Sequence, residues 1–221
     1  MQTTTAHKID SIRWVSDAAF VLRFDRRDLP FAPGQYLSVG PSGEINMREY
    51  SVYSAPSEEF LEILVKVVDG GYVSRRLAEL TPGDPIAVDG PFGYFTVDDD
   101  WRDHRYVFIA TGTGISPFHC FAGAYPGMDY QLLHGVRTSA ERYDHEVFER
   151  TRIVTCITGD NSSDYHGRVT GYLRDLRDQE SGINTAARYY LCGNCDMIYE
   201  AFDILQDAGV PHNQLFAEVY F

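Results

Sequence analysis

Residues 110–118 read ATGTGISPF, and this stretch decides how the second half of the chain folds. It follows the apolar run RYVFIA at residues 105–110, which is typical of a buried strand, and it can continue into a helix. Gly112 and Gly114 allow the backbone to approach an anion, and the first N–H groups of a following helix would point at it. The stretch is not the GxGxxG fingerprint, because Pro117 stands where the third glycine belongs. Taken alone, it predicts either a nucleotide-binding loop or an ordinary turn between strand and helix.

The residues around this stretch alternate short apolar strands with helices. Such alternation predicts a parallel sheet with crossover helices, which is the pattern of an α/β lobe. The expected strands cover residues 106–110, 130–134, 153–157, 189–192 and 215–220. The expected helices cover residues 115–124, 142–149, 169–178 and 197–207.

The first half of the chain reads instead as β-rich. Short alternating runs separated by Gly, Pro and Asp predict a small antiparallel barrel. These runs are residues 7–15, 19–24, 35–39, 48–54, 60–67 and 85–89. One helix is expected over residues 73–80, and the acidic run DDDWRD at residues 98–103 is the expected linker. We therefore predict two domains, residues 1–98 and residues 99–221.

Composition excludes several classes of function. A chain of 221 residues that is 44% hydrophobic can bury a sizeable core. Its 19 basic and 32 acidic side chains give a net charge of -13, so nucleic acid and anionic membranes are poor partners. No apolar signal region opens the sequence, and no run approaches the roughly 20 apolar residues of a membrane span. We expect a soluble, cytoplasmic monomer.

The four cysteines are too few for the disulfide framework of a secreted protein. Cys192 and Cys195 form a CxxC, but there is no second CxxC and no paired histidines to complete a zinc site. Loop cysteines without a metal are the favoured interpretation, and we predict no metal site. A thioredoxin-like redox pair is the alternative, although that motif belongs in a different βαβ context.

The run MREYSVYS at residues 47–54 has the residue types of a ligand site. The two-residue period of a strand puts Arg48 and Tyr50 on one face, with Ser51 just beyond. A cation, a flat ring and a hydroxyl can hold a phosphate, stack on a planar heterocycle and hydrogen-bond its edge. The alternative is a surface strand with a half-buried tyrosine.

Two glycine-rich runs follow in the barrel half. The run DGGYVS at residues 69–74 opens the expected helix, so that the N–H groups of Tyr72, Val73 and Ser74 are available for a second phosphate. The run GPFGYF at residues 90–95 has the small and aromatic residues of a loop that packs under a ligand, or of a plain turn.

Six motifs thus occur in order across nearly the whole chain: RxYS, GGxxS before a helix, GPxGxF, TGTGIxPF, CGNxxM and a terminal EVYF. Together they resemble the ferredoxin–NADP(+) reductase family of flavoproteins. The resemblance implies a six-stranded antiparallel barrel that binds flavin, followed by a five-stranded parallel sheet that binds the pyridine nucleotide. The aromatic C-terminus and the overall resemblance favour FAD as the flavin, with FMN as the alternative. It also implies hydride transfer between NADP(H) and FAD and single-electron transfer between FAD and a separate ferredoxin or flavodoxin.

The resemblance assigns roles to residues on the flavin side. Arg48 would pair with the flavin phosphate, Tyr50 would stack on the isoalloxazine, and Ser51 would hydrogen-bond near N5. The residues that match the strand beside the ribityl chain and the phosphate-binding helix start are Val65, Lys66, Val67, Gly71, Tyr72, Val73 and Ser74.

On the nucleotide side, Cys192 and Glu218 would line the nicotinamide site, where a carboxylate can stabilise positive charge or relay a proton. Tyr220 fits the place of a terminal ring that stacks on the flavin, but Phe221 follows it, so either ring can take that place. The catalytic set is therefore Ser51, Cys192, Glu218 and Tyr220. The further residues matched to the nucleotide are Gly112, Thr113, Gly114, Val136, Thr158 and Gly193, with Phe221 assigned to cofactor binding.

The choice between NADP and NAD depends on arginines for the 2′-phosphate. Arg137, which ends the run HGVR, and Arg168 match two of them, whereas Gly159 replaces a third. This count favours NADP, with NAD possible. The alternative functions are an NADH-dependent reductase component of an oxygenase, a reductase of free flavin or quinone, and an electron-transfer or nucleotide-sensing subunit of a larger complex.

Overall fold

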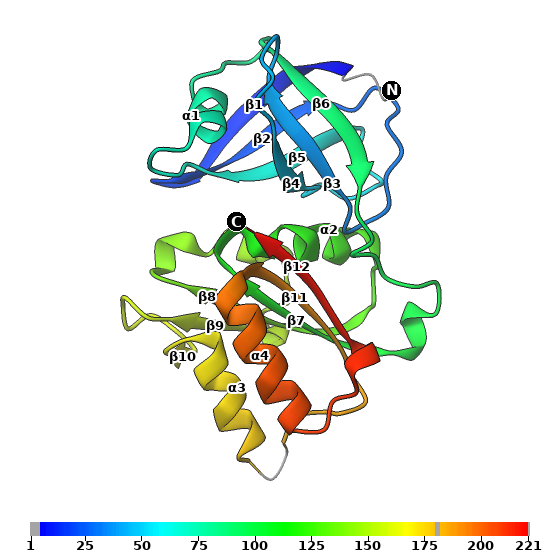
Figure 1. Cartoon of the computed structure of the whole chain (residues 1–221), viewed down its shortest axis with the longest axis vertical. Coiled ribbons are helices and arrows are strands. Elements are labelled where there is room, and N and C mark those ends of the chain that lie inside the picture. Colours follow the sequence, from blue (N-terminus) through cyan, green and yellow to red (C-terminus); the bar gives the residue numbers. More distant parts are fainter. Residues whose placement is uncertain (1–4, 180–181, 221) are drawn as a thin grey trace. The chain divides into compact units, whose positions relative to one another are not determined.

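The computed structural model describes residues 5–179 and 182–220, and it divides into two compact units (Figure 1). Unit 1 comprises Met1–Thr96 and Ser116–Tyr125, and unit 2 comprises Val97–Ile115 and Pro126–Phe221. In the described ranges, no helix has the length and apolar character needed to cross a membrane. The domain boundary at residue 98 stays a prediction.

Unit 1 is built on a six-stranded sheet in the order β4-β3-β6-β1-β2-β5, in which neighbouring strands run antiparallel. The strands are β1 (Thr5–Ser16), β2 (Ala19–Asp25), β3 (Tyr36–Pro41), β4 (Arg48–Ser51), β5 (Phe60–Lys66) and β6 (Pro85–Phe92). A bridge between Val52 and Ile63 joins the two edges, β4 and β5. The sheet therefore closes, and the predicted six-stranded antiparallel barrel is confirmed.

The interior of the barrel follows from alternation along its strands. Phe20, Leu22 and Phe24 of β2 lie opposite Val65, Ile63 and Leu61 of β5, and all six are buried in one cluster. The helix α1 (Tyr72–Ala78) adds Val73 and Leu77 to that cluster, which confirms the helix expected over residues 73–80.

Helix α2 (Ser116–Ala124) belongs to unit 1 by its contacts, although it follows the first strand of the parallel sheet. His119 stacks on Tyr53 with ring centroids 3.7 Å apart, and its Nδ1 lies 2.8 Å from the carbonyl oxygen of Tyr53. Phe118 and Phe121 are fully buried and lie 6.1 and 6.3 Å from the ring of Phe95. Aromatic packing therefore fixes α2 to the barrel.

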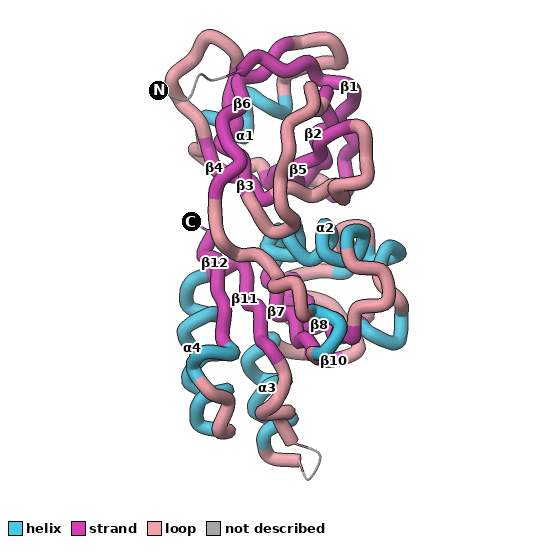
Figure 2. The backbone as a smooth tube through the Cα atoms, turned by 90° about the vertical axis from the view of Figure 1, so that its right-hand side faces the viewer, coloured by secondary structure: helices cyan, strands magenta, loops and turns pink. Residues whose placement is uncertain are grey.

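Unit 2 contains a six-stranded sheet in the order β10-β9-β8-β7-β11-β12, with all neighbouring strands parallel. Figure 2 shows β12, β11, β7 and β8 following one another in this order. The strands are β7 (Arg105–Thr111), β8 (Asp129–Val136), β9 (Ile153–Ile157), β10 (Tyr165–His166), β11 (Arg188–Asn194) and β12 (Leu215–Tyr220). All five predicted strands are present, but the sheet has six strands and not five, because β10 was not predicted. The two-residue strand β10 has no apolar run, so hydrophobic periodicity could not reveal it.

Helices α3 (Val169–Arg177) and α4 (Cys195–Asp207) pack on one face of this sheet (Figure 1). Leu173 of α3 and Ile198 of α4 share a buried cluster with Ile109 and Leu191 of the two central strands. Both helices were predicted from their apolar periodicity and are confirmed.

The helix expected over residues 142–149 is wrong. The chain forms short 3-10 turns there: η3 (Ser139–Glu141), η4 (His145–Val147) and η5 (Arg150–Arg152). Asp144 adopts a left-handed conformation with φ 45, and the two buried aromatic rings of the segment, Tyr143 and Phe148, are five residues apart. Residues at that spacing do not share a helical face, so burying both rings favours an irregular path.

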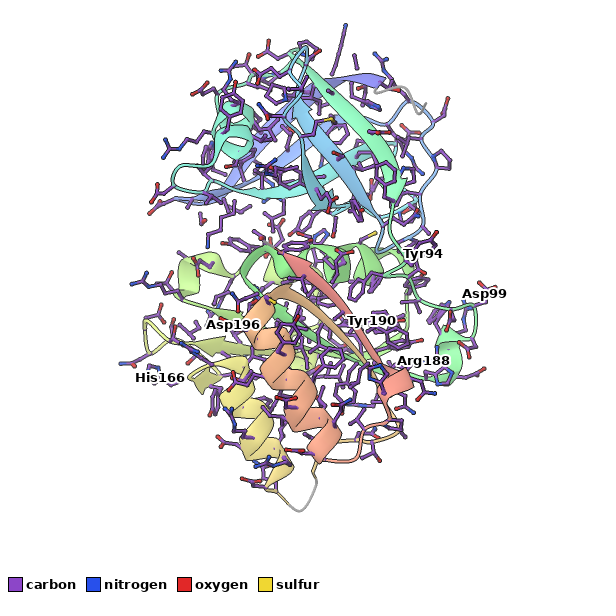
Figure 3. All side chains as sticks on the ribbon, viewed as in Figure 1. Tyr94, Asp99, His166, Arg188, Tyr190 and Asp196 are labelled. Carbon is purple, nitrogen blue, oxygen red and sulfur yellow. The ribbon has the colours of Figure 1, made fainter. Side chains whose placement is uncertain are left out.

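The acidic segment expected as the linker is held to β11 by an ion-pair cluster around Arg188. Figure 3 labels Arg188 and, from the acidic segment, Asp99. The Arg188 guanidinium lies 3.3 Å from a carboxylate oxygen of Asp98 and 3.0 Å from one of Asp100. Its second terminal nitrogen lies 2.8 Å from His104 Nε2. Among the described residues, this segment is therefore part of unit 2 and carries the 3-10 turn η1 (Trp101–Asp103), in which Trp101 is buried.

Candidate functional site

The order of strands in unit 2 places a switch point between β7 and β11. From β7 the chain continues outward through β8, β9 and β10, and it then returns to the other side of β7 to form β11 and β12. In open parallel sheets, ligands bind at the carboxyl ends of the two strands where the order reverses. Those ends are Thr111 and Asn194, and the stretch ATGTGISPF begins at the first of them.

The backbones after β7 and β11 approach so closely that only glycine fits. A Cβ on Gly114 would lie 2.2 Å from the carbonyl oxygen of Cys192, and a Cβ on Gly193 would lie 2.4 Å from Thr111 Oγ1. Thr111 Oγ1 also accepts a hydrogen bond of 2.9 Å from the backbone N–H of Asn194. The two loops are therefore fixed to each other at the switch point, which leaves their backbone groups at the edge of the sheet.

Asn194 has a second role that sequence reasoning missed. Its side chain accepts a 3.1 Å hydrogen bond from the backbone N–H of Met197 and so caps α4. An asparagine just before a helix is the sequence signal that could have identified the cap. The contact with Thr111 had no such signal, because the two residues are far apart in the sequence.

The three predicted catalytic residues of unit 2 lie on neighbouring strands. Cys192 of β11 is opposite Glu218 of β12, and Asn194 is opposite Tyr220. The Cys192 thiol is fully buried, and burial raises its pKa well above the ordinary value. The charge of Glu218 raises this pKa further, whereas a hydrogen bond with Tyr220 acts in the opposite direction. The structure thus brings these side chains together and keeps Cys192 protonated, in contrast to the thiolate of a thioredoxin-like pair.

The predicted 2′-phosphate arginines lie at the carboxyl edge of the same sheet. Arg137 follows the last residue of β8, and Arg168 precedes the first residue of α3, just after β10. Because β8, β9 and β10 are adjacent parallel strands, both residues lie at one edge, with roughly 10 Å between the two outer strands. Both side chains are exposed.

Among the arginines that the structure describes in unit 2, these are the two whose guanidinium groups have no ion-pair, hydrogen-bond or aromatic-ring partner. Arg102 stacks on the ring of Trp101, and Arg142 donates to the carbonyl of Ser162. The arginines in ion pairs are Arg105, Arg150, Arg152, Arg174, Arg177 and Arg188. Glu200 has an electrostatic interaction with Arg168, but it forms its ion pair with Arg174. Two unpaired cations at a ligand-binding edge can take an anion.

Gly159, which stands where a third arginine was expected, packs directly against the backbone of Arg137, so there is no room for a side chain at this position. The N–H of Gly159 donates to the carbonyl oxygen of Arg137 at 2.7 Å, and a Cβ on Gly159 would lie 2.5 Å from that oxygen. A larger residue at position 159 would therefore displace the backbone of Arg137. Thr158, also assigned to the nucleotide, is exposed beside it, whereas Val136 is buried.

On the flavin side, β4 places the motif RxYS at the edge of the sheet in unit 1. Arg48 is exposed and donates to the carbonyl of Met47 at 2.8 Å. Tyr50 is half-buried against the barrel core, and burial raises the pKa of its phenol to about 12, with an opposing effect of the Arg48 charge. The neutral ring of Tyr50 can stack on an aromatic ligand, and the exposed guanidinium of Arg48 can pair with a phosphate of the same ligand. Ser51 is 1% exposed.

The other residues assigned to the flavin differ in what their side chains can reach. Val65 and Val73 are buried in the barrel core, so their side chains are not available to a ligand. Lys66 and Tyr72 are exposed, Val67 and Gly71 are half-buried, and Ser74 accepts a 3.2 Å hydrogen bond from the backbone N–H of Val68. Phe221 lies outside the described residues.

Comparison with known proteins agrees with this geometry. A family model described as an oxidoreductase FAD-binding domain matches residues 7–97. A flavodoxin/ferredoxin–NADP reductase of Escherichia coli K12 is 28% identical over 218 residues, which cover 86% of this chain and 85% of the relative. A ferredoxin NADP+ reductase from Neisseria gonorrhoeae, solved with bound FAD and NADP, superposes over 99% of both chains with a TM-score of 0.87 and 24% identity.

Similar curated proteins also include longer reductases. The phenol hydroxylase P5 protein of Acinetobacter pittii is 27% identical over 206 residues, which cover 87% of this chain but 58% of the relative. The reductase component of a propane 2-monooxygenase from Mycolicibacterium goodii is 27% identical and is covered over 59% of its length. The chain thus spans less than two thirds of these relatives.

Proposed function

We propose that this chain belongs to the ferredoxin–NADP(+) reductase family of flavoproteins and that it transfers hydride between NADP(H) and FAD. It would then exchange single electrons between FAD and a separate ferredoxin or flavodoxin. The matching model and relatives support the predicted family, the FAD cofactor and the oxidoreductase class. The nucleotide, the acceptor and the role of each residue are our proposals.

The residues of unit 1 fit FAD. Arg48 would pair with a phosphate, Tyr50 would stack on the flavin ring, and the first N–H groups of α1 would meet a further phosphate. FAD, when bound, takes two electrons with a hydride and passes them on one at a time. Ser51 would hold a hydrogen bond near N5.

In unit 2, the glycines at the switch point would let the pyridine nucleotide lie close to the backbone. Glu218 would stabilise positive charge on the nicotinamide, because a carboxylate beside a ring that becomes positively charged lowers the energy of that charge. Cys192 would act by its small size and not as a nucleophile, because burial keeps its thiol protonated.

The observation that supports NADP best is the pair of unpaired arginines, Arg137 and Arg168. A charge-assisted hydrogen bond to a phosphate contributes about 1.5–3 kcal/mol, which corresponds to a factor of roughly 10 to 150 in affinity. Arg137→Ala should therefore raise the KM for NADPH at least about 10-fold and leave the KM for NADH within about two-fold. Steady-state kinetics with ferricyanide as acceptor measure both values.

Arg105→Ala is the matched control. Arg105 is an exposed arginine at the opposite edge of the sheet, where β7 begins, and it pairs with Asp129 at 3.2 Å. Removing its charge should change neither KM. An equal rise of both KM values in the Arg137 variant would remove Arg137 from the 2′-phosphate site and favour NADH.

The second candidate is an NADH-dependent reductase component of an oxygenase. It is favoured by the similarity to the phenol hydroxylase P5 protein and by Gly159, which closes the position of a third arginine. Wild-type enzyme that prefers NADH to NADPH in the same assay would support this candidate.

The acceptor is tested with the reduced enzyme. Rapid reduction of a ferredoxin or flavodoxin at low salt supports the proposal, whereas rapid turnover of free flavin or quinone alone supports a free-acceptor reductase. Bound FAD with negligible diaphorase activity would favour an electron-transfer subunit. We propose that the protein is a cytoplasmic monomer. Its net charge of -13 favours solubility and disfavours binding to anionic membranes and nucleic acid.

A further inference from the structure

His134, which none of the roles above uses, contacts the loop of the stretch ATGTGISPF. It lies in β8 opposite Ala110 of β7 and is 0% exposed. Its Nε2 lies 2.9 Å from the carbonyl oxygen of Gly112, and its Nδ1 lies 2.7 Å from Nε2 of His145. A fully buried imidazole thus connects a histidine on η4 with the first residue of the 3-10 turn η2 (Gly112–Ile115).

The partners of His134 determine where its proton resides. A carbonyl oxygen only accepts hydrogen bonds, so Nε2 of His134 must carry the proton and donate to Gly112. Its Nδ1 is then an acceptor, and His145 must donate to it from Nε2. The two hydrogen bonds therefore run in one direction, from His145 through His134 to Gly112.

We propose that His134 is a positioning residue for the pyridine nucleotide, and that it acts by fixing the peptide bond between Gly112 and Thr113. This inference rests on the proposed function. In a trans peptide the C=O and the N–H point in opposite directions. Since the Gly112 carbonyl faces His134 on β8, the N–H of Thr113 faces away from β8, at the edge of the sheet where the nucleotide is proposed to bind.

His145 is the second part of this arrangement. Without its donor at Nδ1, His134 could carry the proton on either nitrogen, and one of the two tautomers cannot hold the Gly112 carbonyl. Gly112 has φ 53 and no atom within 4 Å of the position of a Cβ, so packing alone does not hold it. The hydrogen bond from His134 supplies that restraint.

Both imidazoles are neutral at ordinary pH. Burial lowers the pKa of His134 to about 4, and burial, together with electrostatic repulsion between the two imidazoles when both are protonated, lowers that of His145 to about 3. The charged and titratable groups that face the pair are Glu141, Arg142, Arg150 and Asp164. A neutral pair keeps the hydrogen-bond direction unchanged across the neutral range.

The test compares two ligands in isothermal titration of the FAD-loaded protein. NADP+ carries the pyrophosphate that would meet Thr113, whereas adenosine 2′-monophosphate carries only the part that would meet Arg137 and Arg168. His134→Phe should weaken NADP+ about 10-fold, as expected for one lost hydrogen-bonded restraint, and change the 2′-monophosphate less than about two-fold. His134→Gln should restore most of the NADP+ affinity, because its amide nitrogen can donate to Gly112.

His7→Phe is the matched control. His7 is also buried, with 1% exposure, and its Nδ1 lies 2.6 Å from the carbonyl oxygen of Asp25 in unit 1. This variant loses a comparable imidazole–carbonyl hydrogen bond and should bind NADP+ like wild type. Unchanged NADP+ affinity in His134→Phe, or an equal loss for both ligands, overturns the inference.

Two further results separate the inference from the proposed function. Wild-type protein that binds neither NADP+ nor NADH refutes the proposed function, and the positioning role is refuted with it. Nitrogen NMR of histidine-labelled protein reads the tautomer directly, and a proton on Nδ1 of His134 overturns the inference whatever the protein binds. If His134→Phe does not fold, His145→Phe tests the same tautomer and affinity.

Discussion

Gly112 and Gly114 are separated by one residue, yet the fold constrains them differently. Gly112 needs glycine for its left-handed conformation, φ 53, and has open space around it. Gly114 needs glycine because a Cβ would lie 2.2 Å from the carbonyl oxygen of Cys192 and 2.8 Å from the Cα of Gly193. The same residue type in one motif therefore serves backbone conformation at one position and close packing at the other.

This difference predicts unequal effects of alanine. Gly112→Ala should lower the free energy of unfolding by about 1 kcal/mol, which is the cost of a left-handed alanine. Gly114→Ala should lower it by about 3 kcal/mol, since the backbone of β11 must move. Urea unfolding followed by circular dichroism measures both. Equal losses would show that packing against β11 does not constrain Gly114.

At the scale of elements, β8 carries a titratable group into the core of the sheet. His134 is neutral in the folded state, with its pKa lowered by burial to about 4 from an ordinary 6.5. Between these two values the unfolded chain binds a proton that the folded chain does not, so stability falls as the pH falls through this window.

We therefore expect the free energy of unfolding of wild type to decrease more steeply between pH 6.5 and 4.5 than that of His134→Gln. The difference in slope should be up to about 1.4 kcal/mol per pH unit, the value for one proton. Urea unfolding at several pH values in that range measures it. The carboxylates titrate in both proteins, so parallel slopes would mean that His134 is already charged in the folded state.

The elements that the sequence predicted well are those whose signal is local. The strands at residues 153–157 and 215–220 match β9 and β12 residue for residue, because each is a compact run of mostly apolar residues next to polar ones. The region of residues 142–149 failed, since its helical pattern was overridden by the burial of Tyr143 and Phe148 in tertiary contacts. The pattern of apolar residues along this segment cannot show that both rings are buried by contacts with other parts of the chain.

In the candidate site as well, features encoded by a local motif were predicted, whereas contacts between residues far apart in the sequence were not. Arg137 and Arg168 were predicted from motifs, and the sheet does place them at one edge. The contact between Thr111 and Asn194 and the link from His145 to Gly112 were not predicted. Each joins side chains and backbone groups from different strands or turns, and no spacing in the sequence encodes it.

At the scale of the whole molecule, Arg188 holds the segment through which the chain enters unit 2. Its side chain is 17% exposed and pairs with Asp98 and Asp100. The short turn beside these acids is closed by backbone hydrogen bonds from Asp103 to Asp100 and from His104 to Trp101. Removing the arginine would leave a cluster of like charges next to that turn.

Arg188→Ala should therefore increase amide hydrogen exchange at Asp103 and His104 about 5-fold, which is the effect of losing roughly 1 kcal/mol of local stability. Arg177→Ala is the control, because Arg177 pairs with the adjacent Asp178 on the exposed end of α3. Hydrogen exchange read by mass spectrometry measures both. Unchanged exchange in the Arg188 variant would show that the buried Trp101 alone holds the segment.

The assignment of α2 to unit 1 has a consequence for how the protein is made. The barrel strands end at Phe92, but the helix that buries Phe95 is completed only at Ala124, after β7 of the other unit has been synthesised. On the ribosome, the first unit thus cannot finish packing before part of the second has emerged. A fusion protein that contains only the barrel strands would lack α2. Because α2 lies in the sequence after the first strand of unit 2, the two units cannot be separated by a single cut in the gene.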